Sequence, residues 1–589
     1  MIPERTPFGR RQRRWDRISW WYSLLFALPL IGLIVTLAVS AGDDDSLTGV
    51  VLDAYTGSPV SGAIVSTAHA TATTNGSGEF SITDLTATTL AVSREAYEST
   101  EVAVTDDAES IEVSLRPTTV SGIVTHRRTL EPLSGIEVRA EGPNGESFTT
   151  MTDDDGRYTL DDIPAGATIS VHYEGFTVAS RLIGEDVDLD FEIRPDVLSG
   201  RVTDQAGVPL EGASVAIGEA IVTTEPDGTF RLGAVPESGV ITVKKAGYRD
   251  LSGELPESLV FNAQLEEFRV KAIYVTANTA ALDYRWEEML AVVESTEVNA
   301  IVLDLKDSVG LVYYDTNVVM AHEIGAVSPI LDIEQRLGDM QERGIYTIAR
   351  IVVFEDPLLA QARPDLAIHD TATGGLWKTW NGLAWVNAHE REVWHYNIAL
   401  AVEAANLGFD EIQLDYIRFP SDGMLELADY GPEYADSTRL DAITGFLAEM
   451  QQALAPTGAL LAVDIFGITM WEEDDGGIGQ NFAAIAPFVD VVCPMIYPSH
   501  FYPGAIGLDI PNNHPYEVIY TSLMSGAAMV PEAREKLRPW LQDFSYGEGI
   551  EYGDIEVLAQ IRAADDFGAN GWMIWNPGNE YRLGSFNGS

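Results

Sequence analysis

Carboxylates end several short apolar runs in the C-terminal half of the chain. In Asp410–Pro420, Asp415 closes a β-type stretch, and Arg418 lies in the loop that follows. A second run, Leu460–Asp464, ends in Asp464. Hydrolysis of a glycosidic bond needs two carboxyl groups, one protonated to assist the leaving group and one ionised as nucleophile or base. Asp415 and Asp464 are therefore the candidate catalytic pair, with Glu355 and Asp543 as alternatives to Asp464 for the acid.

Other side chains at the same run ends could bind or orient a substrate. Flat aromatic rings stack on the apolar faces of sugars, and charged or amide groups bind their hydroxyls. Asp304 and Asp307 are expected to orient Lys306, Arg350 or a sugar hydroxyl. Aromatic residues crowd the run ends and loops, with Trp471 and Trp575 foremost, although any one of them could be a core residue. The candidate binding residues are Asp304, Arg350, Gln413, Arg418, Trp471, Tyr497, Asp543 and Trp575. The other aromatics are Trp377, Trp380, Trp385, Phe501, Tyr502 and Trp540.

The elements that position these residues alternate between strand and helix patterns. Such alternation, with polar groups at one strand end, is typical of a (β/α)₈ TIM barrel whose site lies on the C-terminal face. The barrel is predicted over residues 268–589, independent of the segments before it. Its seventh strand is weak because Pro539 interrupts it. The predicted strands are 270–276, 299–305, 345–353, 411–416, 460–464, 489–495, around 537–544, and 571–575. The predicted helices include 283–295, 333–343, 392–407, 437–454 and 554–567.

The N-terminus predicts export. Basic residues in segment 1–17 precede Ile18–Gly42, which contains no charged residue and exceeds the roughly 20 residues that span a bilayer. This charge order predicts a single-pass anchor with the rest of the chain outside the cell. The alternative is a signal peptide cleaved near Ala38–Ser40, which would release the protein.

Residues 46–265 contain three copies of a pattern about 75 residues long. Each copy has a G-x-V segment, a Pro-rich turn before a glycine, and a turn that ends in Gly78, Gly156 or Gly228. Short alternating strands with regularly spaced turns predict β-sandwich repeats at 46–117, 118–195 and 196–266. The acidic turn Asp153–Asp155 could bind calcium or simply be solvated. The whole region could bind carbohydrate or act as a stalk, and the stalk is the favoured interpretation.

Composition narrows the partners. The chain has 90 acidic and 36 basic residues, a formal net charge of -54. Such a surface repels a phosphate backbone, so no nucleic-acid partner is expected. Cys493, the only cysteine, is predicted to be a core residue. We expect a monomer without a cofactor, with a polysaccharide or cell-wall glycan as its partner.

Two other functions remain open. The histidines are scattered without an H-E-x-x-H spacing, which disfavours a metal-dependent polysaccharide deacetylase without removing it. No phosphate loop or G-x-S-x-G motif is present. A catalytically silent glycan-binding protein is the remaining alternative, because a barrel fold alone does not establish an activity.

Two family resemblances accompany these patterns. The three repeats resemble the carboxypeptidase regulatory-like domain through their G-x-V, P-L-x-G and D-G-x-F/Y pattern, from which the first departs at Val60 and Ser77. Residues 268–589 resemble a glycoside hydrolase-like domain family near the chitinase-like and amylase-like barrels. The matching segments are Leu303–Asp307, Ile348–Val353, Gln413–Pro420, Asp464–Gly467, Pro494–Tyr497 and Gly571–Trp575.

The resemblance implies a glycosidase-like barrel and gives Asp415 a role. Amylase-like barrels place a nucleophilic aspartate at the end of strand four, so by this similarity Asp415 is the nucleophile or base. The chitinase-like D-x-x-D-x-D-x-E strand is absent, and the substrate-assisted mechanism of that family is not carried over. A structural alternative for Asp415 is an ion pair with Arg418 or Arg350 that has no catalytic part.

Overall fold

The computed structural model describes residues 46–83, 88–105, 110–184, 186–431 and 434–586. The chain divides into two compact units, Met1–Pro195 and Asp196–Ser589, which are described separately. The predicted anchor Ile18–Gly42 lies outside the described residues. Within the described ranges, no helix is both long enough and apolar enough to cross a membrane.

Each of the three repeats forms one three-stranded and one four-stranded sheet, with the same order of strands. The first repeat has sheets β4-β1-β7 and β3-β2-β5-β6, built from β1 (Leu47–Asp53), β2 (Ile64–Ser66), β3 (Thr71–Thr73), β4 (Glu79–Ile82), β5 (Thr89–Ser93), β6 (Thr100–Ala103) and β7 (Ser110–Leu115). The second has β8 (Val120–His126), β9 (Glu137–Glu141), β10 (Ser147–Met151), β11 (Arg157–Leu160), β12 (Thr168–His172), β13 (Ala179–Leu182) and β14 (Phe191–Ile193). The third has β15 (Leu198–Asp204), β16 (Ser214–Ile217), β17 (Ala220–Thr223), β18 (Thr229–Leu232), β19 (Val240–Lys244), β20 (Leu251–Glu254) and β21 (Ala263–Leu265).

The repeated turn glycines have the predicted left-handed backbone. Gly78, Gly156 and Gly228 have φ angles of 75°, 73° and 78°. A β-carbon on Gly78 would lie 2.5 Å from the carbonyl oxygen of Val51, so a side chain has no room there. In the second repeat, the Asp153 carboxylate accepts the backbone N–H groups of Asp155 and Arg157, which makes this acidic turn self-bonded.

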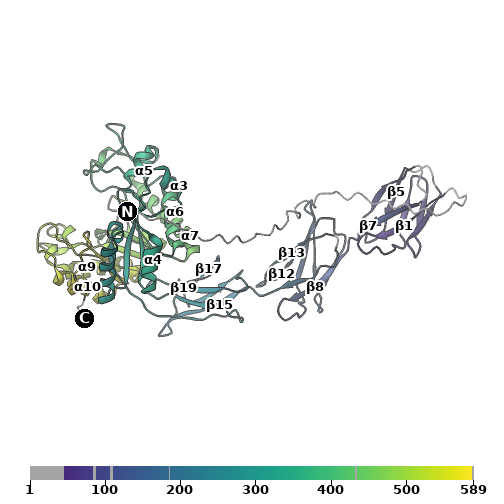
Figure 1. Ribbon diagram of the computed structural model, residues 1–589, viewed down its shortest axis with the longest axis horizontal. Helices are drawn as coiled ribbons and strands as arrows, with labels where there is room; N and C mark the ends of the chain where they lie inside the picture. Colours follow the sequence, from purple (N-terminus) through teal and green to yellow (C-terminus); the bar gives the residue numbers. More distant parts are fainter. Residues whose placement is uncertain (1–45, 84–87, 106–109, 185, 432–433, 587–589) are drawn as a thin grey trace, which may run out of the picture. The chain divides into compact units, whose positions relative to one another are not determined.

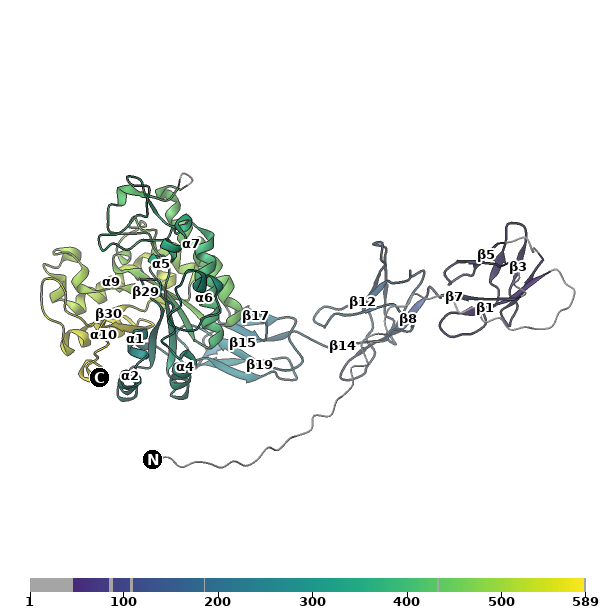
Figure 2. The ribbon, with the colours of Figure 1, turned by 45° about the horizontal axis from the view of Figure 1, so that its top comes forward.

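The C-terminal half forms the predicted closed barrel of eight parallel strands, surrounded by helices (Figure 1, Figure 2). The strands are β22 (Val270–Val275), β23 (Ala300–Lys306), β24 (Tyr346–Val352), β26 (Glu411–Asp415), β28 (Leu460–Phe466), β29 (Val491–Met495), β30 (Trp540–Gln542) and β31 (Gly571–Trp575). The helices are α1 (Ala277–Ala280), α2 (Asp283–Ser295), α3 (Val319–Glu323), α4 (Ile333–Glu342), α5 (Pro357–Ala362), α6 (Arg391–Leu407), α7 (Arg439–Leu454), α8 (Phe482–Ile485), α9 (Pro515–Met529) and α10 (Asp554–Phe567). A short ribbon, β25 (His369–Asp370) with β27 (Ala428–Asp429), joins two loops.

Two elements differ in detail from the sequence prediction. Strand β30 has three residues, and its paired register with β29 is the single pair Met495 and Trp540. This agrees with the interruption expected at Pro539, which cannot donate a backbone hydrogen bond. Helix α9 was not predicted; it packs beside α10. Its buried residues form one stripe, but that stripe includes Ser522 and Gly526, and the apolar Met524 is exposed outside it, so the apolar residues alone do not mark the helix.

The interior of the barrel is layered. Near the N-terminal strand ends, Arg538 donates to both oxygens of Glu411 at 2.8 and 2.9 Å, and the pair is almost fully buried. Above it lie apolar and weakly polar side chains that include Ile348, Met573 and the predicted core residue Cys493. The polar cluster described below occupies the C-terminal ends.

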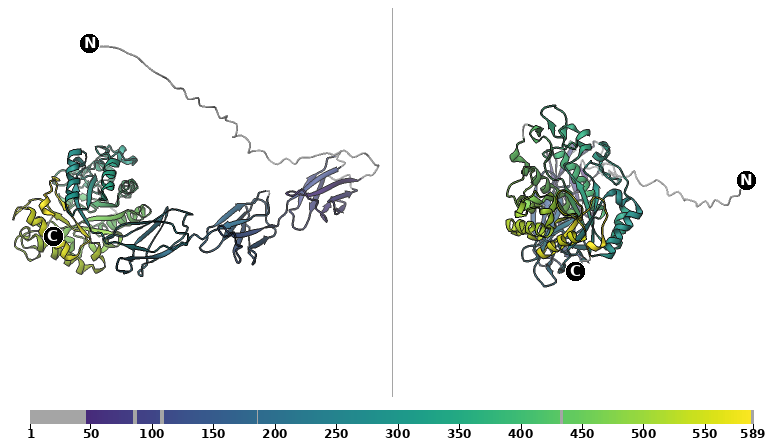
Figure 3. Two further views of the ribbon diagram at one scale, coloured as in Figure 1. Left: turned by 60° about the horizontal axis from the view of Figure 1, so that its bottom comes forward. Right: turned by 90° about the vertical axis from the view of Figure 1, so that its left-hand side faces the viewer.

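The third repeat packs against the N-terminal end of the barrel, and Figure 3 shows it beside the barrel. Ala246, in the turn between β19 and β20, packs against the interior apolar cluster. Gly247 accepts the backbone N–H of Phe268 at 2.8 Å and lies against the side chain of Asn570. Asn570 directly precedes β31, and Phe268 lies two residues before the start of β22. The sequence pattern had indicated a barrel that is independent of the repeats. This prediction was wrong for the third repeat, which contacts the N-terminal strand ends of the barrel.

Candidate active site

Arg350 is the centre of a buried charge cluster at the C-terminal strand ends. Its Nη1 atom donates to Asp304 at 2.6 Å, and its Nε atom donates to Asp415 at 3.2 Å. The side chains of these three residues are 5–7% exposed. Strand β24 carries Arg350 between β23 with Asp304 and β26 with Asp415, so the strand order itself makes this contact. One guanidinium thus donates hydrogen bonds to two carboxylates.

Asp464 lies at the next strand end and has a different environment. It is 1% exposed, and its Oδ1 atom accepts the indole N–H of Trp540 at 2.7 Å. Its Oδ2 atom has no hydrogen-bond partner among the described residues. Burial raises the pKa of Asp464 well above its ordinary value, and the nearby Asp415 charge raises it further. A neutral Asp464 therefore has its unpartnered oxygen available to carry the proton.

Two aromatic rings close the cluster from the side of β22 and β31. Trp575 stacks on Tyr274 with ring centroids 3.9 Å apart, and the Arg350 guanidinium lies 5.1 Å from the Trp575 ring. The Tyr274 hydroxyl donates to Asp304. Tyr274 was missing from the predicted site, although it is the penultimate residue of strand one. Trp575 is half-buried, so part of its ring remains open to a ligand.

The chain turns sharply after Asp415. Tyr416 has a φ angle of 53°, a conformation that is strained for a residue with a bulky side chain. Its backbone N–H donates to the Asp415 carboxylate at 2.6 Å. Such strain persists where the surroundings hold it, and it is common at functional sites.

Glu355 and Arg418 stand beside the cluster in the loops after β24 and β26. Burial raises the pKa of Glu355 to about 7, with Arg418 opposing that shift and Asp415 adding to it. The Arg418 guanidinium lies 4.9 Å from the Trp385 ring and 4.6 Å from the Phe466 ring. Of the two arginines that the sequence offered as partners of Asp415, Arg350 makes the contact, whereas Arg418 follows the turn at Tyr416 and lies over aromatic rings.

The other predicted binding residues divide between the cluster and its surroundings. Tyr497 belongs to the interior layer with Trp540 and Trp575. Gln413 is fully buried one layer below Asp415 and donates to the Met573 sulfur. Asp543 accepts from Asn576 at 3.0 Å and from Arg582 at 2.9 Å. Trp471 packs in the hydrophobic layer outside the barrel, where its indole donates to Ser522 of α9.

Three of the six remaining predicted aromatics are core residues. Trp377, Trp385 and Trp540 are each 1% exposed, whereas Trp380 and Tyr502 are 70% exposed.

Lys306 and Asp307 have structural contacts outside the cluster. A register shift in β23 between Asp304 and Lys306 turns the lysine away from Asp304. Lys306 instead forms a fully buried ion pair with Asp356 at 2.9 Å. Asp307 accepts from the backbone of Leu311 and from the Tyr313 hydroxyl. In the described ranges, no group of three His, Cys, Asp or Glu side chains could hold a metal ion.

Family models match both halves of the chain. The model described as a putative glycosyl hydrolase domain matches residues 272–581, more than half of the sequence. The carboxypeptidase regulatory-like domain model matches residues 46–116 and 119–194. The third repeat lies outside those matches but has the same strand order as the second. No curated protein sequence matches the chain significantly.

Several solved structures match part of the chain. A hypothetical protein from Ruminiclostridium thermocellum ATCC 27405 is 32% identical, and the match covers 35% of this chain and 100% of that one, with a TM-score of 0.31. The PgaB (BpsB) glycoside hydrolase domain from Bordetella bronchiseptica is 10% identical over 54% and 98% of the two chains, with a TM-score of 0.41. A chitinase from Chromobacterium violaceum ATCC 12472 is 13% identical over 55% and 99%, with a TM-score of 0.36.

Proposed function

The chain belongs to the family described as putative glycosyl hydrolase domains, and we propose that its barrel hydrolyses a polysaccharide with Asp415 and Asp464 as the two carboxyl groups. The observation that carries this proposal is the contrast between the two neighbours. Asp415 has a cationic partner, Arg350, whereas Asp464 has an indole partner and a raised pKa. A carboxylate that is held by a cation suits the nucleophile or base, and a carboxyl group with a raised pKa suits the acid.

In this mechanism Asp415 acts as the nucleophile or base. The Arg350 guanidinium and the Tyr416 backbone N–H both donate to its carboxylate, which fixes the orientation of the side chain. Because Arg350 also binds Asp304, the guanidinium itself is held from two sides. Such pre-organisation keeps the attacking oxygen in one position.

Asp464 supplies the proton to the leaving oxygen. Leu414 of β26 pairs with Val463 of β28, so Asp415 and Asp464 are the next residues along neighbouring strands. Parallel strands lie about 4.8 Å apart. Retaining glycosidases place their carboxyl groups roughly 5–5.5 Å apart. We therefore expect retention of the anomeric configuration, which NMR of the first-formed product would show.

Glu355 is the second candidate for the acid. Its pKa of about 7 is close to that of an efficient general acid at neutral pH, and at 8% exposed it is more accessible than Asp464. Asp464→Asn and Glu355→Gln separate the two assignments. The variant that loses more activity on substrates with poor leaving groups than on activated ones identifies the acid.

The direct test is Asp415→Asn in the chain from residue 46 onward. Release of reducing ends from a panel of polysaccharides is expected to fall by a factor of about 10²–10⁴. Circular dichroism would show that the variant folds, and the exposed Asp441→Asn on α7 is the matched control. Undiminished cleavage by Asp415→Asn would remove this residue from the mechanism. Failure of the variant to fold would favour a structural ion pair with Arg350.

The location is a further part of the proposal. The uncharged segment Ile18–Gly42 and the basic residues before it support a single-pass anchor with residues 46–589 outside the cell. Retention of the full chain in alkali-washed membranes would agree with an anchor. A mature N-terminus near Ala41 would instead support the secreted alternative.

A further inference from the structure

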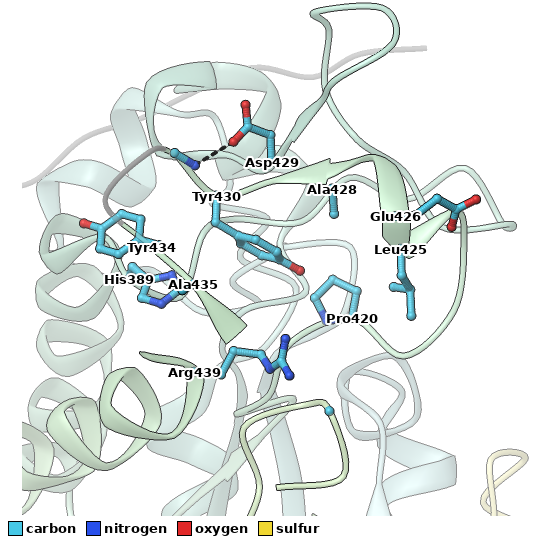
Figure 4. Close-up of a pocket in the computed structure, with 12 residues that line it drawn as sticks. His389, Pro420, Leu425, Glu426, Ala428, Asp429, Tyr430, Tyr434, Ala435 and Arg439 are labelled. Carbon is cyan, nitrogen blue, oxygen red and sulfur yellow. Dashed lines mark hydrogen bonds between the residues drawn. The ribbon is translucent and has the colours of Figure 1, made fainter. Parts of the chain in front are cut away.

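A recess lies beside the loop that follows β26, and this loop begins at the strand end that carries Asp415. Figure 4 shows the recess. We call it the loop pocket. Its volume is about 430 Å³, which is within the range of small-molecule sites. Figure 4 shows His389 and Tyr434 on one side and Pro420 and Leu425 on the other, with Tyr430 between them. The residues that matter for its chemistry are His389, Pro420, Glu426, Asp429, Tyr430 and Arg439.

The aromatic wall of the loop pocket is held in place. The rings of His389 and Tyr434 stack with centroids 4.0 Å apart and planes at 12°. Both ring nitrogens of His389 are bonded, one to Asn387 and one to Thr438. Burial lowers the pKa of His389 to about 4, so this ring is uncharged at neutral pH. Such a fixed, neutral ring pair is a stacking surface rather than a charged one.

The polar side of the loop pocket carries both signs of charge. Glu426 and Asp429 are exposed carboxylates that accept hydrogen bonds. Arg439 already contacts Asp475 at 3.3 Å, so its charge is partly compensated. An anionic ligand would meet two carboxylates here. An uncharged ligand with many hydroxyl groups could donate to the carboxylates and lay its C–H faces on the rings.

A short stretch of chain connects the loop pocket to the proposed catalytic cluster. Pro420 is five residues beyond Asp415, which limits the separation of their Cα atoms to about 18 Å. Phe419, between Asp415 and Pro420 in the sequence, has its ring 5.1 Å from that of His389 and 5.3 Å from that of Tyr430. A glycan cleaved at Asp415 could therefore extend into the loop pocket.

We propose that the loop pocket binds an uncharged glycosyl unit of the same polysaccharide, at a distance from the bond that is cleaved. The identity of the ligand rests on the proposed function, whereas the location of binding does not. Binding at the loop pocket, in addition to binding at Asp415, holds the polysaccharide along the C-terminal face of the barrel. The affinity for a glycan should therefore increase with the length of the glycan. It also selects neutral glycans over acidic ones.

The test measures binding in an Asp415→Asn background, in which the proposed hydrolysis is blocked. Isothermal titration calorimetry would use cellohexaose, maltohexaose and the hexamer of N-acetylglucosamine as neutral probes, and hexagalacturonate as the anionic probe. Ala435 is exposed and lines the loop pocket, and its backbone bonds to Thr438 do not involve its side chain. Ala435→Trp would therefore fill the recess. The control is Ala291→Trp on the exposed face of α2.

We expect Ala435→Trp to weaken the best neutral probe by about tenfold or more, which corresponds to roughly 1.4 kcal/mol. Ala291→Trp should leave the affinity unchanged. Equal affinities in the two variants, no binding by any neutral probe at millimolar concentration, or tighter binding of hexagalacturonate would each overturn the proposal. The chain with Asp415 intact could also cleave none of the polysaccharides while a neutral probe still binds and Ala435→Trp lowers its affinity. In that case the hydrolase proposal fails, and the proposal that the loop pocket binds a glycosyl unit is supported.

Discussion

Replacement of Arg350 by methionine tests how much the buried positive charge of Arg350 stabilises the cluster. The change keeps an unbranched apolar stem but leaves the carboxylates of Asp304 and Asp415 buried without their shared cation. Removing one partner of a buried ion pair costs about 3–5 kcal/mol, because a charge is left without compensation. A carboxylate can avoid this cost by taking up a proton. The free energy of protonation at a given pH is therefore an upper limit on the loss of stability per carboxylate.

The limit can be worked out for Asp304. Burial raises its pKa, and Arg350 opposes the shift. Without Arg350 the folded-state pKa rises further above the unfolded value of about 3.9. Holding a proton at pH 7 costs at most about 4 kcal/mol, and at pH 5 about 1.5 kcal/mol, at 1.36 kcal/mol per pH unit. The defect is therefore absent below about pH 3.9 and grows as pH rises toward the folded-state pKa.

The assay is urea unfolding of the chain from residue 46, followed by tryptophan fluorescence. Every tryptophan after residue 46 lies in the barrel, so the signal reports this domain alone. Arg350→Met is compared with Arg343→Met, which removes an exposed pair with Glu294 and should cost about 1 kcal/mol or less. A defect below 1 kcal/mol at pH 7, or an equal defect at pH 5 and pH 7, would refute the reasoning.

Three further outcomes are expected. Glu355→Gln should stabilise the barrel by about 1–3 kcal/mol at pH 8 but not at pH 4. The Glu355 carboxyl group has a folded-state pKa of about 7, so it destabilises the fold increasingly as pH rises above its unfolded-state pKa near 4.3. Urea midpoints that shift equally at both pH values would contradict this. Trp540→Phe removes a hydrogen bond that lowers the pKa of Asp464, so the alkaline limb of the pH–rate profile should move upward, and an unmoved limb would separate Asp464 from that limb. A fragment of residues 268–589 should melt below one of residues 196–589 in calorimetry, since the contacts of the third repeat with the barrel are lost; equal melting temperatures would show that the joint adds no stability.

The sequence predicted the barrel because its strands end in polar side chains at a shared edge. Asp304, Asp415 and Asp464 are all strand-end residues, and the closed sheet brings Asp304 and Asp415 onto one arginine. Which arginine pairs with Asp415 could not be read from the pattern. That choice depends on the register of β24 and on the left-handed turn at Tyr416, which sends Arg418 toward aromatic rings.

Periodicity also explains what the pattern missed. The buried stripe of helix α9 includes Ser522 and Gly526, and the apolar Met524 lies outside it, so the pattern of apolar residues alone did not indicate a helix. The joint between the third repeat and the barrel depends on backbone contacts of Gly247 and on a small side chain, Ala246. Such contacts have no chemical signature in the sequence.

The contact between the third repeat and the barrel determines where tension on the chain is applied. Gly247 and Ala246 contact the barrel at the N-terminal strand ends, near the buried pair of Glu411 and Arg538, whereas the carboxylates lie at the opposite ends of the same strands. Tension on the chain before Asp196 is therefore applied to the barrel at its N-terminal strand ends. That end of the barrel is opposite to the strand ends that carry Asp415 and Asp464.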